Sequence, residues 1–160
     1  MKKNKPLYML LFASLIILLS SCVGFQVSSP KPSDFNAVYN GFSQDQAGHL
    51  VIPVTFTKPV DQASVVVNRS LFLKFTKDPN AAATLSWSAN SEVLTITTVK
   101  TRDELMSFTP DDGFCLTLRG TSKVISREAV VVRSKAEVAL DGDYDGKPGG
   151  DYHMCFFIIG

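Results

Sequence analysis

The sequence predicts an all-β protein, an antiparallel β-sandwich of about seven strands. From Phe35 onward, apolar and polar side chains alternate with a period of two, which is typical of half-buried strands. Turn-forming residues separate these runs, and only one short stretch has a helical start signal. The length of 160 residues suits one domain, and 45% hydrophobic against 19% charged residues argues against disorder.

Residues 1–22 have the features of a targeting segment. Lysines at positions 2, 3 and 5 precede an apolar run over 7–19, which is too short to span a bilayer of roughly 30 Å. The run ends in Leu19-Ser20-Ser21-Cys22, which closely resembles the lipobox of bacterial lipoproteins. This resemblance implies cleavage before Cys22 and acylation of that cysteine. An ordinary secretory signal and an uncleaved anchor are the alternatives.

The resulting division of the chain has three parts. Residues 1–21 form the lipoprotein signal peptide, residues 22–34 the lipidated cysteine with a flexible tether rich in Ser and Pro, and residues 35–160 the sandwich domain. The anchor places the protein in the bacterial cell envelope, attached to a membrane through its lipid. By analogy with enterobacterial sorting, Val23 after the cysteine favours the outer membrane.

The first predicted strand covers residues 50–57, where four apolar side chains share one face. Pro53 cannot donate to a strand ladder, so the strand is an edge there or contains a bulge. A polar turn at 90–91 joins two β-rich runs into a hairpin. Further strands are expected over 71–75, 85–89, 94–98, 114–118, 129–132 and 152–159.

One helical turn is expected around Arg102 to Ser107. Thr101 is available as its N-cap and Glu104 as the partner in a capping box. Trp87 and several of the 11 Phe residues are expected to fill the core, because aromatic residues at period two on an apolar face are usually buried. A ligand-stacking platform is the alternative.

The order of short motifs resembles bacterial Ig-like domains of the surface-layer (SbsA) type. The segment 54–61, VTFTKPVD, is similar to the start of these domains, and Trp87 followed by Leu94-Thr95-Ile96 is similar to their central strand pair. Residues 114–118 and Leu140-Asp141-Gly142 with Phe156 match later motifs. The resemblance covers about Phe35 to Ile159. It implies an Ig-like sandwich that serves as a spacer or interaction module.

The most chemically distinctive segment is the acidic loop, residues 141–151. Aspartates at positions 1, 3 and 5 with glycine at position 6 match the start of an EF-hand loop, but Tyr152 replaces the glutamate at position 12. Calcium prefers such clusters of hard oxygens. The sequence therefore offers two interpretations: a solvated hairpin turn, or a calcium loop of another shape with ligands Asp141, Asp143, Asp145 and Asp151.

Cys115 and Cys155 remain after lipidation of Cys22. An even pair in an oxidising envelope compartment predicts a disulfide, and two unpaired thiols are the alternative. A zinc site that combines these cysteines with His49 and His153 lacks any supporting spacing.

No catalytic residues are predicted. The sequence contains no nucleophile elbow, P-loop or dinucleotide fingerprint, and a net charge of +1 gives no basic excess for nucleic acid. The expected function is a non-enzymatic interaction module that binds an envelope protein or a glycan. A structural accessory subunit of an envelope complex is the alternative, and an enzyme with a site assembled from loops is the third possibility.

Overall fold

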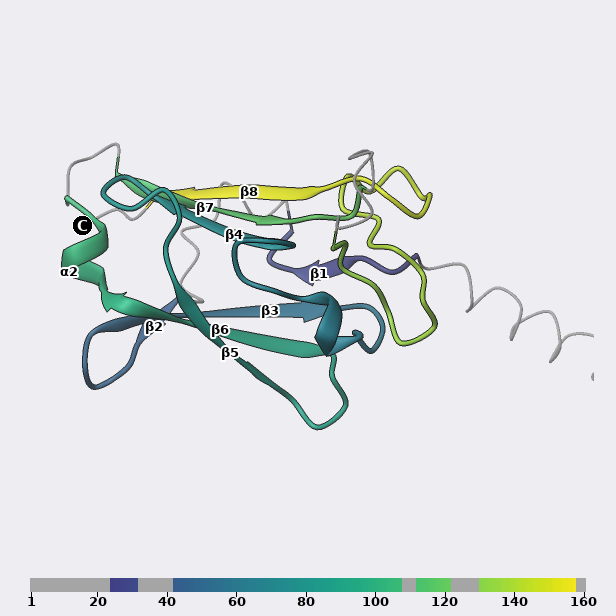
Figure 1. Cartoon of the computed structure of the whole chain (residues 1–160), viewed down its shortest axis with the longest axis horizontal. Coiled ribbons are helices and arrows are strands. Elements are labelled where there is room, and N and C mark those ends of the chain that lie inside the picture. Colours follow the sequence, from purple (N-terminus) through teal and green to yellow (C-terminus); the bar gives the residue numbers. More distant parts are fainter. Residues whose placement is uncertain (1–23, 32–41, 108–111, 122–129, 158–160) are drawn as a thin grey trace, which may run out of the picture.

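Two antiparallel β-sheets pack face to face, as the two layers of strands in Figure 1 show. The computed structural model describes residues 24–31, 42–107, 112–121 and 130–157. The predicted all-β sandwich is confirmed. Within the described residues, one sheet has five strands and the other has three.

The five-stranded sheet has β3 (His49–Phe56) and β6 (Val93–Thr101) at its centre. The predicted hairpin joins β5 (Ala83–Trp87) to β6, with Trp87 opposite Leu94. On the other side, β3 pairs with two short strands, β1 (Val27–Ser29) and β2 (Ser43–Gln44). Strand β5 therefore forms one edge of this sheet.

The three-stranded sheet has β7 (Gly113–Leu118) between β4 (Leu71–Phe75) and β8 (Tyr152–Phe157). Both pairs are antiparallel and run in register without a bulge. The predicted last strand thus forms, and its residues beyond 157 lie outside the described part of the chain.

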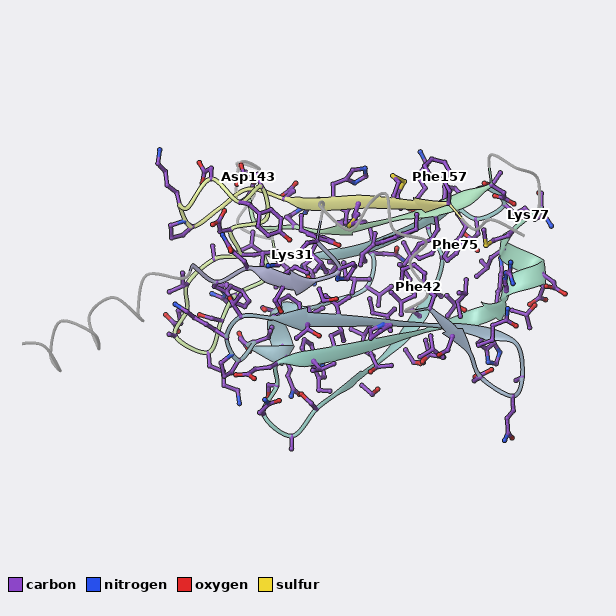
Figure 2. The ribbon with its side chains drawn as sticks, turned by 180° about the vertical axis from the view of Figure 1, so that it is seen from behind. Lys31, Phe42, Phe75, Lys77, Asp143 and Phe157 are labelled. Atoms are coloured by element: carbon purple, nitrogen blue, oxygen red, sulfur yellow. A yellow bond between two sulfur atoms is a disulfide. The ribbon has the colours of Figure 1, made fainter. Side chains whose placement is uncertain are left out.

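The core lies between the sheets because alternate side chains of each strand point inward. In β3 every second residue from Leu50 to Phe56 is buried. Phe75, Phe114 and Phe156 form a stack with ring centroids 5.0 and 5.1 Å apart. Figure 2 shows Phe42 and Phe75 in the space between the layers. Trp87 is only partly buried and covers Phe56 from the edge strand, with centroids 6.3 Å apart.

Pro53 lies in the middle of β3, where the sequence predicted an edge or a bulge. The proline is paired with Thr95 of β6 on one side. On the other side β1 pairs with residues 55 and 56 and β2 with residues 50 and 51, so neither covers Pro53. Among the described residues, no strand therefore pairs with this side of Pro53, the position that cannot donate a hydrogen bond.

The predicted strand over 129–132 is wrong for residues 130–132, and residue 129 lies outside the described chain. The Val132 N–H donates to the Arg119 carbonyl, and the Val132 carbonyl accepts from Leu140 N–H. Val132 is fully buried, so its apolar side chain packs in the core. An apolar β-branched run therefore stays a loop here.

The predicted helical turn forms as α2 (Arg102–Leu105) with the expected capping box. Glu104 Oε2 accepts from the Thr101 backbone N–H at 2.8 Å, and Thr101 Oγ1 accepts from Glu104 N–H at 3.4 Å. A second short turn, η2 (Gln62–Ser64), follows the β3 strand and is capped by Asp61. Each helix is short, because the residue that follows it, Val65 after η2 and Met106 after α2, has an extended backbone.

The predicted flexible tether over residues 22–34 is wrong for residues 24–31. Phe25 and Val27 are buried, and β1 pairs with the end of β3. Phe25 stacks on Phe56 with ring centroids 5.7 Å apart. The Ser and Pro content suggested a linker, but two apolar side chains at period two were enough to add this segment to the sheet.

The signal peptide, Cys22 and the rest of the tether lie outside the described residues. Among the residues that are described, no helix has the length and apolar character needed to cross a membrane.

Candidate metal site

The acidic loop lies between Leu140 and β8, at the end of the sandwich opposite α2 (Figure 1). Its base is closed by main-chain hydrogen bonds: Gly149 N–H donates to the Leu140 carbonyl at 3.0 Å, and Gly142 N–H to the Gly149 carbonyl at 3.2 Å. These bonds hold the beginning and the end of the loop together, so the aspartates between them are brought to one place.

Three of the four predicted ligands come together. Asp141, Asp143 and Asp145 each offer a carboxylate oxygen, and these atoms all lie within 4.8 Å of one another. Asp151 is not part of this group. Its Oδ1 accepts hydrogen bonds from the backbone N–H groups of Gly120 and Thr121, at 3.0 and 2.9 Å. The fourth aspartate thus ties a neighbouring segment to the base of the loop.

Two glycines allow the loop to adopt this shape. Gly146 has φ of +83° and its N–H donates to Asp141 Oδ2 at 3.2 Å. Gly150 has φ of +76°, and a Cβ there would lie 2.3 Å from Asp143 Oδ1. The Asp143 carboxylate therefore packs directly on a backbone that only glycine can provide.

Asp141 is the buried member of the group, with 1% of its surface exposed. Its Oδ2 accepts from Gln26 Nε2 at 2.6 Å as well as from Gly146, whereas Oδ1 has no hydrogen-bond partner among the described residues. Asp143 and Asp145 are exposed. Within the described residues, none of the three carboxylates forms an ion pair with Lys or Arg. Such a site attracts cations.

The loop also binds the N-terminal segment of the domain. Asp141 N–H donates to the Phe25 carbonyl at 2.8 Å, and the Tyr144 hydroxyl donates to the Val27 carbonyl at 2.9 Å. Neither Gln26 nor Tyr144 was predicted as a site residue. Gln26 lies 115 residues from Asp141, so no sequence spacing signals the contact. Tyr144 lies within the loop, but its partner in the N-terminal segment cannot be read from the motif.

Cys115 and Cys155 are joined by a disulfide, with Cα atoms 3.9 Å apart. The two residues lie directly opposite each other in the register of β7 and β8. Both are half-buried on the outward face of the three-stranded sheet, and the predicted disulfide is present. The bond therefore links a central strand to its neighbour across 40 residues of chain.

The two histidines lie in different surroundings. His153 is next to the disulfide, with Nδ1 2.7 Å from Thr117 Oγ1 and Nε2 3.5 Å from Cys155 Sγ. His49 instead contacts Asp45, with Nδ1 2.8 Å from Oδ2. Because the disulfide occupies both sulfurs, Cys115, Cys155 and His153 offer no thiolate ligand for zinc in this state.

Comparison with known proteins assigns no family to the chain. No protein-family model matches the sequence, and neither does any curated protein. Among solved structures, domains 1–6 of surface layer protein SbsC match with a TM-score of 0.46 and 16% sequence identity. The match covers 86% of this chain and 14% of that chain.

Proposed function

We propose that this chain is a lipid-anchored module of the bacterial cell envelope, that it acts without catalysis, and that it mediates interaction with an envelope protein or a glycan. The observation that carries the proposal is the sequence Leu19-Ser20-Ser21-Cys22 after a basic start and a short apolar run. The β-sandwich supports it, because a rigid sandwich on an anchor can present loops and strand edges to a partner.

The position of the first buried residues determines how such an anchor holds the domain. Cys22 precedes Gly24 by two residues, a reach of at most about 7 Å in an extended chain. Phe25 already belongs to the core. A lipid on Cys22 would therefore hold the sandwich at the membrane surface, with the acidic loop at the near end and α2 at the far end.

Metabolic labelling of cells with radiolabelled palmitate tests the anchor. We expect the label in the wild-type chain and in Ser21→Ala, which keeps a small residue before the cysteine, and none in Cys22→Ser. Equal labelling of all three chains, or of none, would exclude lipidation at Cys22.

Crosslinking in intact cells followed by purification of the wild-type chain then tests the interaction. A partner enriched over an unrelated lipoprotein is expected, and the absence of any enrichment would contradict the interaction role.

A structural accessory subunit is the second candidate function, and the edge of the larger sheet favours it. Within the described residues, no strand pairs with the outer edge of β5, where Thr84 and Ser86 are exposed. Such an edge can accept a strand from another protein.

Lysines at this edge test the second function. Thr84→Lys with Ser86→Lys is expected to release a partner subunit in detergent extracts, because charged side chains protect a strand edge from pairing. Ala89→Lys, in the turn after β5, is the control and should keep the partner bound. If both variants retain the same partners, assembly through β5 is excluded.

A further inference from the structure

The Asp141 side chain contains an oxygen atom that the fold leaves unsatisfied. The residue is 1% exposed, and its Oδ1 has no hydrogen-bond partner in the part of the chain that the structure describes. Only Oδ2 is used, by Gln26 and Gly146. A buried carboxylate oxygen without a partner destabilises the folded state, and proteins usually provide either a donor or a cation for it.

The two exposed aspartates provide the second observation. Oxygens of Asp141, Asp143 and Asp145 lie within 4.8 Å of one another, which is about twice the distance of 2.3–2.6 Å between calcium and its oxygen ligands. This spacing is close to what one calcium ion needs in order to contact all three oxygens. Without an ion, the three carboxylates carry like charges at close range, and their repulsion opposes closure of the loop.

We propose that Asp141, Asp143 and Asp145 bind a calcium ion, and that this ion locks the N-terminal segment onto the sandwich. The lock follows from the position of Asp141. Its backbone N–H donates to the Phe25 carbonyl, and its carboxylate accepts a hydrogen bond from Gln26. The neighbouring Tyr144 hydroxyl donates to the Val27 carbonyl. An ion that fixes the Asp141 carboxylate and closes the loop also strengthens these contacts.

The donor set favours calcium over other cations. All three side chains offer hard carboxylate oxygens, which zinc uses less readily than nitrogen or sulfur. Magnesium requires near-ideal octahedral geometry and dehydrates reluctantly, whereas calcium accepts irregular ligand sets that water completes. Asp151 lies outside this group, and its Oδ1 accepts hydrogen bonds from the Gly120 and Thr121 N–H groups. The proposal does not depend on the lipid anchor or on the interaction role.

Thermal unfolding of the full chain in detergent tests the site. A site in the affinity range of extracellular modules, with a dissociation constant of about 1 mM, would raise the Tm by roughly 5 °C in about 10 mM calcium chloride relative to chelator. Magnesium chloride should give a smaller rise. Asp143→Asn with Asp145→Asn should abolish the calcium-dependent rise, and the chain should still fold because both residues are exposed.

Asp151→Asn is the matched control from the same loop. This variant should unfold at a lower temperature than the wild-type chain, because Asp151 caps two N–H groups, but the rise with calcium should remain. A Tm that is the same in chelator and in calcium would overturn the site. A rise that survives in Asp143→Asn with Asp145→Asn would overturn this choice of ligands.

Hydrogen exchange tests the lock separately. Calcium should slow exchange in the peptide that contains residues 24–31, in the wild-type chain and in Asp151→Asn but not in Asp143→Asn with Asp145→Asn. Residues 102–105, at the opposite end of the sandwich, should exchange equally with and without calcium. Protection of the loop alone, with residues 24–31 unchanged, would leave a calcium site but contradict the lock.

Discussion

Gly150 is one of the glycines on which the shape of the acidic loop depends. Its positive φ of +76° already favours glycine, and the Asp143 carboxylate occupies the space that a Cβ would need. Gly146 has a similar φ of +83°, but no atom of the described residues lies within 4 Å of a Cβ there. A side chain at position 146 would therefore cause backbone strain alone, whereas one at position 150 would also clash with Asp143.

Gly150→Ala should destabilise the fold more than Gly146→Ala. The second variant carries only the cost of a left-handed alanine, about 1 kcal/mol, whereas the first adds a clash with Asp143 and should cost about 2–3 kcal/mol. Urea unfolding of both variants in calcium measures the difference. Equal losses would show that Asp143 does not pack on Gly150.

At this scale, sequence reasoning predicted which residue types form the site but not all of their roles. The spacing of Asp141, Asp143 and Asp145 was informative because one tight turn determines it. The position of Asp151 outside the group of three could not be predicted, because its partners, Gly120 and Thr121, are distant in sequence. The contact of Gln26 with Asp141 was not visible for the same reason.

At the scale of elements, period-two alternation predicted most strands because burial on one face determines it. Strands β3, β4, β7 and β8 were predicted within two residues of their observed ends. Period-two alternation did not predict the observed structure where an apolar run was isolated or short. Val132 is buried in the core although residues 130–132 join no sheet, and β1 has only three residues, among prolines and serines that suggested a linker.

The disulfide stabilises the smaller sheet. Closing a chain of 40 residues limits the unfolded ensemble, so Cys115→Ala with Cys155→Ala should lower the free energy of unfolding by about 2–4 kcal/mol. Thr117→Ala, which removes the hydrogen bond to His153 on the same face, should cost about 1 kcal/mol or less. Urea midpoints measure both effects, and a double variant as stable as the wild-type chain would refute the expected role.

The α2 end carries the carboxyl groups whose pKa values are lowered. The Thr101 backbone N–H and hydroxyl lower the pKa of Glu104, the His49 side chain lowers the pKa of Asp45, and the Lys100 ammonium lowers the pKa of Asp78. Because each group binds its proton more weakly in the folded state, its stabilising effect is present above the ordinary pKa near 4. That effect is lost as the pH falls through the lowered value.

Acid should therefore weaken the fold, and Glu104→Gln should weaken this dependence. The variant keeps an oxygen for the helix cap but has no charge to titrate. Between about pH 6 and about pH 3, we expect a smaller fall in the urea midpoint for Glu104→Gln than for the wild-type chain. Identical falls for both chains would mean that Glu104 contributes nothing to the acid sensitivity.

At the scale of the whole molecule, the two ends of the sandwich differ in chemistry. Figure 2 shows Asp143 at one end and Lys77 near the other, where the Lys77 Nζ donates to the Met106 carbonyl beside α2. The described N-terminal segment, residues 24–31, begins at the Asp143 end, beside the proposed calcium site and two residues after the proposed lipidation site at Cys22. The far end and the edge of β5 then stay available for a partner.

Photo-crosslinking in native membranes tests this arrangement most directly. A photoreactive amino acid at Lys147, in the acidic loop, should crosslink to phospholipid, whereas the same group at Asp103 in α2 should not. Both positions are exposed, so neither change disturbs the core. Lipid adducts at position 147 alone are the predicted result. Equal adducts at both positions, or adducts at position 103 alone, would contradict a domain held against the membrane by its N-terminal end.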